Sequence, residues 1–335
     1  MKPRDVASPA EARPLSSDEA AVGRFAHDLA SIWREGSADP AARLGIAVSG
    51  GPDSCALLLL AHAALPGRIE AATVDHRLRA ESGQEAAFVA ALCNSLGIPH
   101  RICAVEVGPG NVQSQARAAR YEALEAWARE CQLGAVATAH HADDQAETFL
   151  LRLNRGSGVA GLAGVRARGI VPGGETLLLR PLLGWRQAEL GMIVQQANVS
   201  AISDPSNLDD RFDRVRLRKV LASAPWLDTA AIAQSASHLA DADMALDWAA
   251  RIEWDRCVSK EGLGMAYRPR APRAIAMRVV ARVVRELDGN EPRGGAVANV
   301  FDALVNGEAI SIGDLVARSG PGGWHFAKAP IRKQK

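Results

Sequence analysis

A short polar stretch has the residue types of a phosphate-binding loop. Residues 49–54 read Ser-Gly-Gly-Pro-Asp-Ser and follow the apolar run LGIAV at 44–48. The two glycines allow the backbone to approach a ligand closely, and the helix predicted to follow offers unpaired N–H groups and the positive end of its dipole. The stretch therefore predicts a site for phosphate or pyrophosphate. A plain turn whose Ser and Asp residues cap a helix has the same composition and is the alternative.

The carboxylate in this loop carries extra information. Asp53 would repel a bare phosphate, but it is suited to hold Mg²⁺ that bridges to a polyphosphate. The loop is not a GxxxxGK[ST] motif because no lysine follows, and it is not a GxGxxG turn. The pattern thus disfavours kinases, GTPases and dehydrogenases.

A second cluster, HHADDQAE at 140–147, combines histidines and acids. His140, Asp144 and Glu147 are predicted to converge at the edge of a sheet, where a helix begins. A metal site is one alternative, but HEXXH spacing is absent and no third histidine follows, which disfavours a zinc hydrolase. The other alternative is that the acids only stabilise the N-terminus of the helix through its dipole.

A third group lies on one face of a predicted helix at about 112–132. Arg117, Arg120 and Tyr121 are three and four residues apart, beside an apolar stripe. Such a face suits an anion, although a solvated arginine pair beside a core tyrosine would show the same spacing.

The chain is close to neutral, with 39 Lys+Arg against 38 Asp+Glu, so affinity for a polyanion requires an uneven distribution. Positive charge gathers at 211–219, where five cations face one acid, and at 256–293, where nine cations face four acids. Both segments suit an RNA backbone, and a plain solvated basic surface is an equal alternative for the second.

The elements that must position these groups are predicted from apolar runs. Strands are expected at 44–48, 69–75, 101–107 and 134–140, alternating with helices at about 22–33, 55–64, 82–96, 112–132 and 142–153. Such alternation implies right-handed crossovers and a mostly parallel sheet covered on both faces. The predicted fold class is α/β, a doubly wound parallel sheet with a second, smaller, mainly helical domain.

The domain organisation follows from changes in composition along the chain. We expect a flexible tail at 1–20, a larger α/β domain at 21–215 and a smaller, basic, mainly helical domain at 216–335 that suits contact with RNA. A strand is also expected within 176–183, a helix at about 186–198, and a small strand pair near 309–327.

Cysteine usage and hydropathy restrict the class of protein. The five cysteines form no CxxC or Cys/His cluster, so neither a disulfide framework nor a zinc framework is expected. No apolar stretch approaches the roughly 20 residues that span a bilayer, and no apolar signal segment opens the sequence. A cytoplasmic protein with reduced thiols and no membrane partner is expected.

Taken in order, these signals resemble a known family. The arrangement of strand, SGGxDS loop and helix is similar to the PP-loop ATP pyrophosphatases, which cleave ATP to AMP and pyrophosphate while adenylating a substrate. Six further stretches resemble the tRNA(Ile)-lysidine synthetase branch of that family in order and spacing: VDHRLRAES at 74–82, ARAARYEAL at 116–124, ATAHHADDQAET at 137–148, LNRGSGVAGL at 153–162, RPLL at 180–183 and DPSNLDDRF at 204–212. Arg77 departs from the pattern because the family usually has glycine there.

The resemblance implies roles for individual residues. The ATP-binding set is Ser49, Gly50, Gly51, Pro52, Asp53, Ser54, Val74 and Asp75. The catalytic set is Asp53, Arg117, His140, Asp144 and Glu147, with Mg²⁺ held by Asp53 and Asp144. The set for the substrate or the tRNA is Arg120, Tyr121, Arg155, Gly156, Ser157, Arg211, Arg214 and Arg218.

The implied reaction is ATP-dependent adenylation of the wobble cytidine in a CAU-anticodon tRNA(Ile), followed by attack of L-lysine to give lysidine. The expected partners are this tRNA and free lysine, and the protein is expected to be a monomer or a homodimer. A PP-loop tRNA thiolase, disfavoured by the lack of a cysteine pair, and an amidating or other adenylating ligase are the enzyme alternatives. An RNA-binding module with a relict nucleotide site is the alternative from another class.

Overall fold

The computed structural model of the chain describes residues 12–16, 19–77, 82–106, 108, 112–202 and 213–329. Packing divides the chain into two units, Met1–His238 and Leu239–Lys335. The boundary expected at residue 215 is thus replaced by a division after residue 238, and the helix that carries Arg214 and Arg218 belongs to the first unit. The masked parts of the expected tail, residues 1–11 and 17–18, lie outside the described residues.

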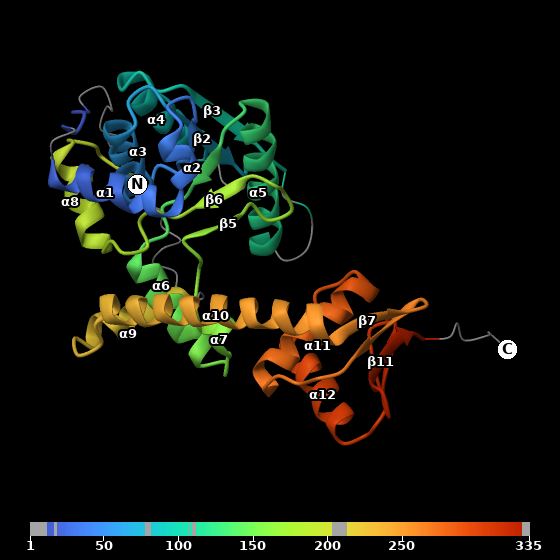
Figure 1. The fold of residues 1–335 in the computed structure, drawn as a ribbon. Helices are drawn as coiled ribbons and strands as arrows, with labels where there is room; N and C mark the ends of the chain where they lie inside the picture. Colours follow the sequence, from blue (N-terminus) through green and yellow to red (C-terminus); the bar gives the residue numbers. More distant parts are fainter. Residues whose placement is uncertain are drawn as a thin grey trace. The chain divides into compact units, whose positions relative to one another are not determined.

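The first unit is built on a six-stranded sheet in the order β3-β2-β1-β4-β6-β5 (Figure 1). Its strands are β1 (Leu44–Ala47), β2 (Ile69–Asp75), β3 (His100–Ala104), β4 (Ala135–Ala137), β5 (Arg168–Ile170) and β6 (Leu177–Leu179). All neighbours are parallel except β5, which pairs antiparallel with β6 and which the sequence pattern did not reveal. The doubly wound α/β fold is confirmed.

Helices cover both faces of this sheet. The described helices of this unit before α10 (Thr229–Cys257) are α1 (Ala20–Ile32), α2 (Arg34–Ala38), α3 (Pro52–Ala64), α4 (Ser82–Ser95), α5 (Val112–Glu130), α6 (Ala142–Leu153), α7 (Val159–Leu162), α8 (Gln187–Gln196) and α9 (Asp213–Ser223), of which α7 and α9 pack against α6. Buried side chains of α1, α3, α4 and α8 form one core cluster, and α5 contributes to a separate cluster with β4 and β6.

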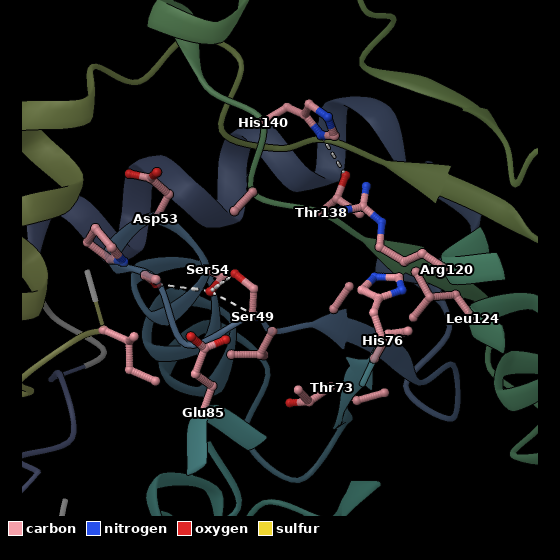
Figure 2. A pocket seen from close by; sticks show the side chains of 18 of the residues that line it. Ser49, Asp53, Ser54, Thr73, His76, Glu85, Arg120, Leu124, Thr138 and His140 are labelled. Carbon is pink, nitrogen blue, oxygen red and sulfur yellow. Dashed lines mark hydrogen bonds between the residues drawn. The ribbon is translucent and has the colours of Figure 1, made fainter. Parts of the chain in front are cut away.

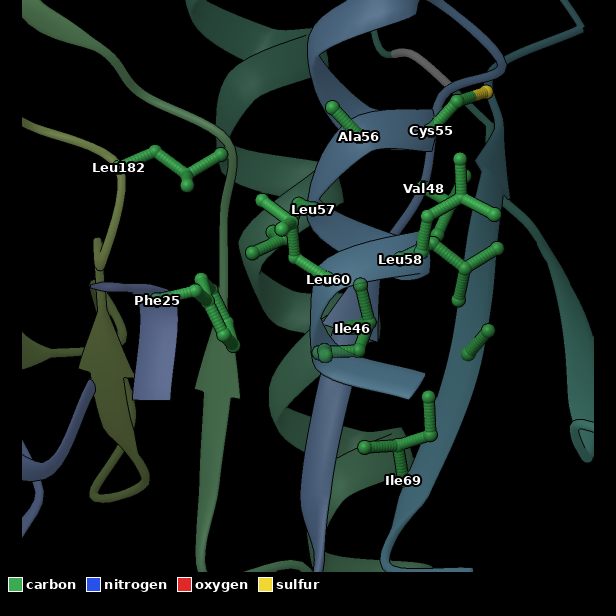
Figure 3. Packing of buried hydrophobic residues seen from close by; sticks show 14 of the residues in the cluster. Phe25, Ile46, Val48, Cys55, Ala56, Leu57, Leu58, Leu60, Ile69 and Leu182 are labelled. Atoms are coloured by element: carbon green, nitrogen blue, oxygen red, sulfur yellow. The ribbon is translucent and has the colours of Figure 1, made fainter. Parts of the chain in front are cut away.

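Helix α3 is the centre of the larger cluster. Its residues 54–61 are all buried, and Leu57, Leu58 and Leu60 pack among Phe25 of α1 and Ile46 of β1 (Figure 3). A helix that is apolar all round is stable only when it is enclosed, as α3 is between the sheet and its neighbours. The N-terminus of α3 is therefore fixed in space directly after β1.

Strand order explains why the two polar clusters of the sequence meet. β1 and β4 are adjacent in the sheet but far apart in the chain, and their carboxyl ends lie at the point where the strand order reverses. In open α/β sheets this point forms the ligand crevice. Residues 49–54 follow β1 and residues 138–141 follow β4, so both open into the same crevice.

The second unit contains an antiparallel sheet that is larger than the strand pair expected from the sequence. The sheet has the order β7-β8-β11-β10-β9. Its strands are β7 (Val258–Glu261), β8 (Gly264–Tyr267), β9 (Ile310–Ile312), β10 (Leu315–Gly320) and β11 (Gly323–Lys328), and its helices are α11 (Arg273–Asp288), α12 (Gly294–Val305) and the later part of α10 (Thr229–Cys257). Tyr267, Trp324 and Phe301 form its core, with ring centroids 5.7 and 5.3 Å apart at nearly perpendicular angles.

The excess of basic residues at 256–293 is offset by acids elsewhere in the second unit. Over residues 239–329, twelve Lys and Arg are balanced by twelve Asp and Glu. Acids outside the basic segment supply the partners, because Arg278 pairs with Asp243 and Asp247 and Arg273 pairs with Asp302. The described part of this unit is therefore not a strongly basic surface.

Candidate active site

The loop after β1 is held by its own hydroxyl groups. Ser49 N–H donates to Ser54 Oγ at 3.1 Å, the two serine Oγ atoms are 3.2 Å apart, and Ser54 Oγ donates to the carbonyl of Gly51 at 2.9 Å. Gly50 has φ 85°, and a Cβ atom there would lie 2.8 Å from Ile202 Cδ1. Only glycine fits both the backbone conformation and the space.

A cavity of about 520 Å³ opens over this loop, which is a size suited to a nucleotide. It is lined by Ala47, Val48, Ser49, Gly51, Pro52, Asp53, Ser54, Ala72, Thr73, Val74, Asp75, His76, Ser82, Glu85, Arg120, Leu124, Thr138, Ala139, His140, Asp144, Gln187, Ile202 and Arg218. Figure 2 shows Asp53 on one side of this space and Arg120 and His76 on the other, with Ser49 and Ser54 between them.

The end of β2 forms the wall opposite the loop. Asp75 Oδ1 accepts a hydrogen bond from the backbone N–H of Arg77 at 2.9 Å, and this bond together with Ser82 lowers the pKa of Asp75. Arg77 has φ 51°, in the left-handed region that favours glycine. This conformation explains why the family usually has glycine at this position. In this chain Arg77 adopts it instead.

Three carboxylates surround the buried imidazole of His141. Its Nε2 atom lies 3.4 Å from Asp53 Oδ2 and 3.6 Å from Asp144 Oδ2, and its Nδ1 atom lies 3.6 Å from Asp143 Oδ2. Burial alone would lower the pKa of His141, but Asp53, Asp144 and Asp143 together raise it. The three carboxylates thus favour the protonated form of the imidazole.

Of these carboxylates, Asp143 has a structural role. It accepts hydrogen bonds from Gln187 N–H at 2.7 Å and Thr229 Oγ1 at 3.2 Å, and it lies 3.4 Å from Arg186 Nη2. Asp53 and Asp144 face the cavity instead, and Asp53 Oδ1 is buried without a hydrogen-bond partner among the described residues.

Glu147 and Arg218 form an ion pair beside the cavity. Arg218 donates from Nε to Glu147 Oε1 and from Nη2 to Glu147 Oε2, the latter at 3.2 Å, and lies 3.7 Å from Asp144. Glu147 is 1% exposed and does not line the cavity, whereas Arg218 does. Burial raises the pKa of Glu147, and Arg218 opposes that shift.

A cluster of arginines lies around His140. Burial, reinforced by the charges of Arg180, Arg120, Arg117 and Arg214, lowers the pKa of His140 to about 3. Its Nδ1 atom is 3.0 Å from Thr138 Oγ1. His140 is therefore a neutral hydrogen-bonding group at neutral pH, rather than an acid catalyst.

The glycine-rich segment after α6 lies apart from the cavity. Gln145 binds both the N–H and the carbonyl of Val165, and Arg152 donates to the carbonyls of Gly161 and Gly164. Arg155 pairs with Asp213 at 3.3 Å, and Arg155, Gly156 and Ser157 do not line the cavity. Arg211 lies outside the described residues, so its predicted contact with tRNA stays a prediction.

The structure thus brings most of the predicted site together and adds residues that sequence reasoning missed. The cavity gathers most of the residues predicted to bind ATP, together with Arg120, His140, Asp144 and Arg218. Arg117, Tyr121, Glu147 and Arg214 lie outside its lining. His141, Thr138, Glu85 and Arg180 were not singled out, although three of them lie within motifs that resemble the family.

The carboxylates fit a magnesium ion shared with a polyphosphate. Mg²⁺ is commonly bound by one or two carboxylates, with substrate phosphates and water completing six ligands. Two carboxylates are available here: that of Asp53, whose Oδ1 atom has no partner among the described residues, and that of Asp144, which faces the cavity. Within the described ranges, no group of three or more His, Cys, Asp or Glu side chains is arranged to hold a metal on its own.

Comparisons with known proteins identify a family model and relatives for this chain. A PP-loop domain model matches residues 22–224. The tRNA(Ile)-lysidine synthase of Novosphingobium aromaticivorans is 47% identical over 313 residues, covering 92% of this chain and 94% of that protein. The enzyme of the same name from Zymomonas mobilis is 40% identical over 298 residues, covering 87% and 90%.

Among solved structures, a U34-tRNA thiolase from Methanococcus maripaludis with its [4Fe-4S] cluster aligns with a TM-score of 0.54. It is 14% identical and the alignment covers 65% of this chain and 78% of that chain. At this identity the likeness concerns the fold alone.

Proposed function

Because this chain belongs to the tRNA(Ile)-lysidine synthase family of PP-loop proteins, we propose that it is an ATP-dependent ligase that converts the wobble cytidine of a CAU-anticodon tRNA(Ile) to lysidine. The observation that carries the proposal is the cavity at the strand switch point, where the loop at 49–54 meets Asp53 and Asp144. The proposed substrates are ATP, this tRNA and L-lysine, and the proposed setting is the cytoplasm. None of the described helices combines the length and the apolar character needed to cross a bilayer.

The reaction has two balanced steps. The C2 oxygen of the cytidine attacks the α-phosphate of ATP, and pyrophosphate leaves. The ε-amine of lysine then attacks C2, the C2–O bond breaks, AMP leaves and one proton is released. The loop N–H groups and the N-terminus of α3 would bind the triphosphate. The carboxyl end of β2 would enclose the adenosine.

Magnesium would supply Lewis-acid stabilisation of charge on the phosphates when it is bound by Asp53 and Asp144. The side chains of this chain have separate tasks. His141 keeps the two carboxylates facing each other, and neutral His140 offers a hydrogen bond at the wall near Arg120. Glu147 orients Arg218 toward the cavity, where Arg218 also lies 3.7 Å from Asp144.

The thiolase alternative lacks support from the thiols of this chain. The five cysteines are buried or half-buried, and burial raises the pKa of Cys55 and Cys93 to about 12. A nucleophilic cysteine needs a lowered pKa and access to substrate. The chemistry therefore rests on the carboxylates and arginines.

The test measures pyrophosphate and AMP release with ATP and Mg²⁺, using no tRNA, the CAU-anticodon tRNA(Ile) transcript, or that transcript with radiolabelled lysine. We expect lysine to enter the tRNA in wild type, and Asp53→Asn to lower the rate at least about 100-fold, as loss of a catalytic carboxylate does. Asp241→Asn, an exposed carboxylate on α10, is the control and should retain full activity. Pyrophosphate release without lysine incorporation would refute lysine as the nucleophile.

A further inference from the structure

Four arginines of the first unit lie around His140. Arg117 and Arg120 lie on α5, Arg180 follows β6, and Arg214 lies on α9. Among the described residues, none of the four forms an ion pair with a carboxylate. By contrast Arg24, Arg43, Arg101, Arg168 and Arg218 in the same unit each pair with a glutamate.

The contacts that these arginines do make leave much of their charge unsatisfied. Arg117 and Arg120 lie over the ring of Tyr121 at 5.0 and 5.1 Å, and Arg120 Nη2 is 3.4 Å from its hydroxyl. Arg180 donates to the carbonyl of Arg166 at 2.7 Å, and Arg214 is 3.4 Å from Thr148 Oγ1. The Nε atoms of Arg120 and Arg180 are buried without hydrogen-bond partners, and Arg180 is 8% exposed.

Such a cluster is costly in the absence of an anion. Burial lowers the pKa of Arg180, and Arg117 and Arg120 add like-charge repulsion, while Tyr121 opposes the shift. Burial alone would raise the pKa of the Tyr121 phenol, yet Arg120, Arg117 and Arg180 lower it. Arg117, Arg120 and Arg180 repel one another, and the Nε donors of Arg120 and Arg180 have no partner among the described residues, so the three form a built site for anionic oxygens. Arg214 adds its positive charge near His140.

The geometry separates this site from the nucleotide cavity. Arg120 and His140 line the cavity, but Arg117, Arg180 and Arg214 do not. The triphosphate already has the loop at 49–54 and the N-terminus of α3 on the side of Asp53, away from Arg120 (Figure 2). The arginines beyond His140 are therefore placed to meet a second phosphate-bearing molecule that approaches Arg120 from outside.

We infer that Arg117, Arg120, Arg180 and Arg214 bind phosphodiester groups of the RNA substrate, with the buried Tyr121 as the residue that positions Arg117 and Arg120. The inference rests on the proposed function for the identity of the RNA. Phosphodiesters recur along the RNA backbone, which suits several guanidiniums spread over three elements of the protein. Planar guanidiniums also form paired hydrogen bonds with phosphate oxygens. Arg120 borders both sites and so links RNA binding to the nucleotide cavity.

This inference changes the role predicted for Arg117. The family resemblance implies a place in catalysis at the phosphate or activated substrate. Arg117 is exposed, it does not line the cavity, and its described contact is with the ring of Tyr121. An RNA-binding role matches all three observations.

The experiment compares RNA binding and ATP binding in separate assays on the full chain. Fluorescence anisotropy measures the Kd of the CAU-anticodon tRNA(Ile) transcript over a KCl series without ATP, and calorimetry measures the Kd of ATP without RNA. We expect Arg117→Gln and Arg180→Gln each to weaken RNA binding about 10-fold and to reduce the slope of log Kd against log[KCl] by about 1, with ATP affinity within about twofold of wild type. Arg101→Gln, which alters an arginine paired with Glu130, is the matched control and should change neither quantity.

Tyr121→Phe tests the positioning role, because it keeps the ring and removes the hydroxyl. RNA affinity should fall about threefold to tenfold with little change in the salt slope, since the four charges remain. Arg117 is exposed, so Arg117→Gln stays informative even if the buried Arg180→Gln variant fails to fold.

Two outcomes would overturn the inference. A loss of ATP affinity with RNA binding intact would assign the cluster to the phosphates of ATP. Unchanged RNA affinity and salt slope in folded Arg117→Gln would leave the cluster without a phosphodiester role. Absence of lysine transfer in wild type would contradict the proposed function, but it would leave these binding results standing.

Discussion

The Nε2 atom of His141 lies 3.4 Å from Oδ2 of Asp53, so one buried imidazole links the start of α6 to the phosphate loop. The two residues come from different helices, and strands β1 and β4 place those helices side by side. Asp144 lies 3.6 Å from the same nitrogen. The imidazole therefore lies between two cavity-facing carboxylates that would otherwise repel each other, and both favour its protonated form.

His141→Gln should weaken divalent-metal binding, because Asp53 and Asp144 would lose the group that fixes their separation. Loss of such a supporting contact typically lowers metal affinity about 10- to 100-fold. Titration of Mn²⁺ in the presence of a non-hydrolysable ATP analogue, followed by electron paramagnetic resonance, measures this affinity. His27→Gln, an exposed histidine on α1, is the control. Unchanged Mn²⁺ affinity in folded His141→Gln would contradict the positioning role.

The pair formed by Glu147 and Arg218 should show strong energetic coupling. Arg218→Met leaves the buried Glu147 carboxylate without its partner, which we expect to reduce the free energy of unfolding by about 3 kcal/mol. In the double variant Glu147→Gln with Arg218→Met, the unpaired charge is gone, so the loss should be smaller than that of Arg218→Met alone. Urea unfolding of the four proteins gives the coupling energy. Additive losses would show that the two side chains do not stabilise each other.

Burial of His140, reinforced by the arginines around it, should give the fold a pH dependence. An unfolded histidine binds a proton near pH 6.5, whereas folded His140 binds it near pH 3, so in this range the unfolded chain holds more protons. The stabilising contribution is full above pH 6.5 and is lost as the pH falls toward 3. Between about pH 7 and pH 5 the loss should be about 1–2 kcal/mol for this group.

His140→Asn provides the comparison for this effect, because it removes the titrating group but keeps a hydrogen-bonding side chain near Thr138 and Arg120. Its free energy of unfolding should fall less than that of wild type over the same pH interval, as measured by urea unfolding. Equal pH dependence of the two proteins would show that His140 titrates normally in the folded state.

Short-range signals were enough to predict much of the catalytic fold. The alternation of apolar strands and helices predicted the sheet, and the loop at 49–54 was identified because Gly50 and Asp53 occur beside a strand in the order that phosphate loops require. The short hairpin of β7 and β8 was missed because each strand has only four residues, and β5 has only three. Gly262, with φ 56° between β7 and β8, is the turn signal that could have revealed the hairpin.

Long-range partners could not be read from the chain. Arg218 looked like part of a basic run, but its partner Glu147 is 71 residues away. Arg278 was counted in a basic segment whose acidic partners, Asp243 and Asp247, lie on α10. In both cases the fold converts apparent excess charge into ion pairs. The arginines around Tyr121 show the opposite, because there the fold brings cations together that form no ion pair with any described carboxylate.

Arg77 supplies a prediction that separates backbone strain from side-chain function. Its φ of 51° costs a non-glycine residue about 1–2 kcal/mol relative to glycine, and the entropy of glycine in the unfolded chain offsets up to about 1 kcal/mol of that. Arg77→Gly should therefore raise the free energy of unfolding by about 0.5–1 kcal/mol, because the hydrogen bond from its backbone N–H to Asp75 is kept. Gln132→Gly, at φ 52° and outside the cavity lining, is the matched control and should show a similar gain. A loss of stability in Arg77→Gly alone, measured by urea unfolding, would mean that the arginine side chain stabilises the end of β2 by more than the backbone strain costs.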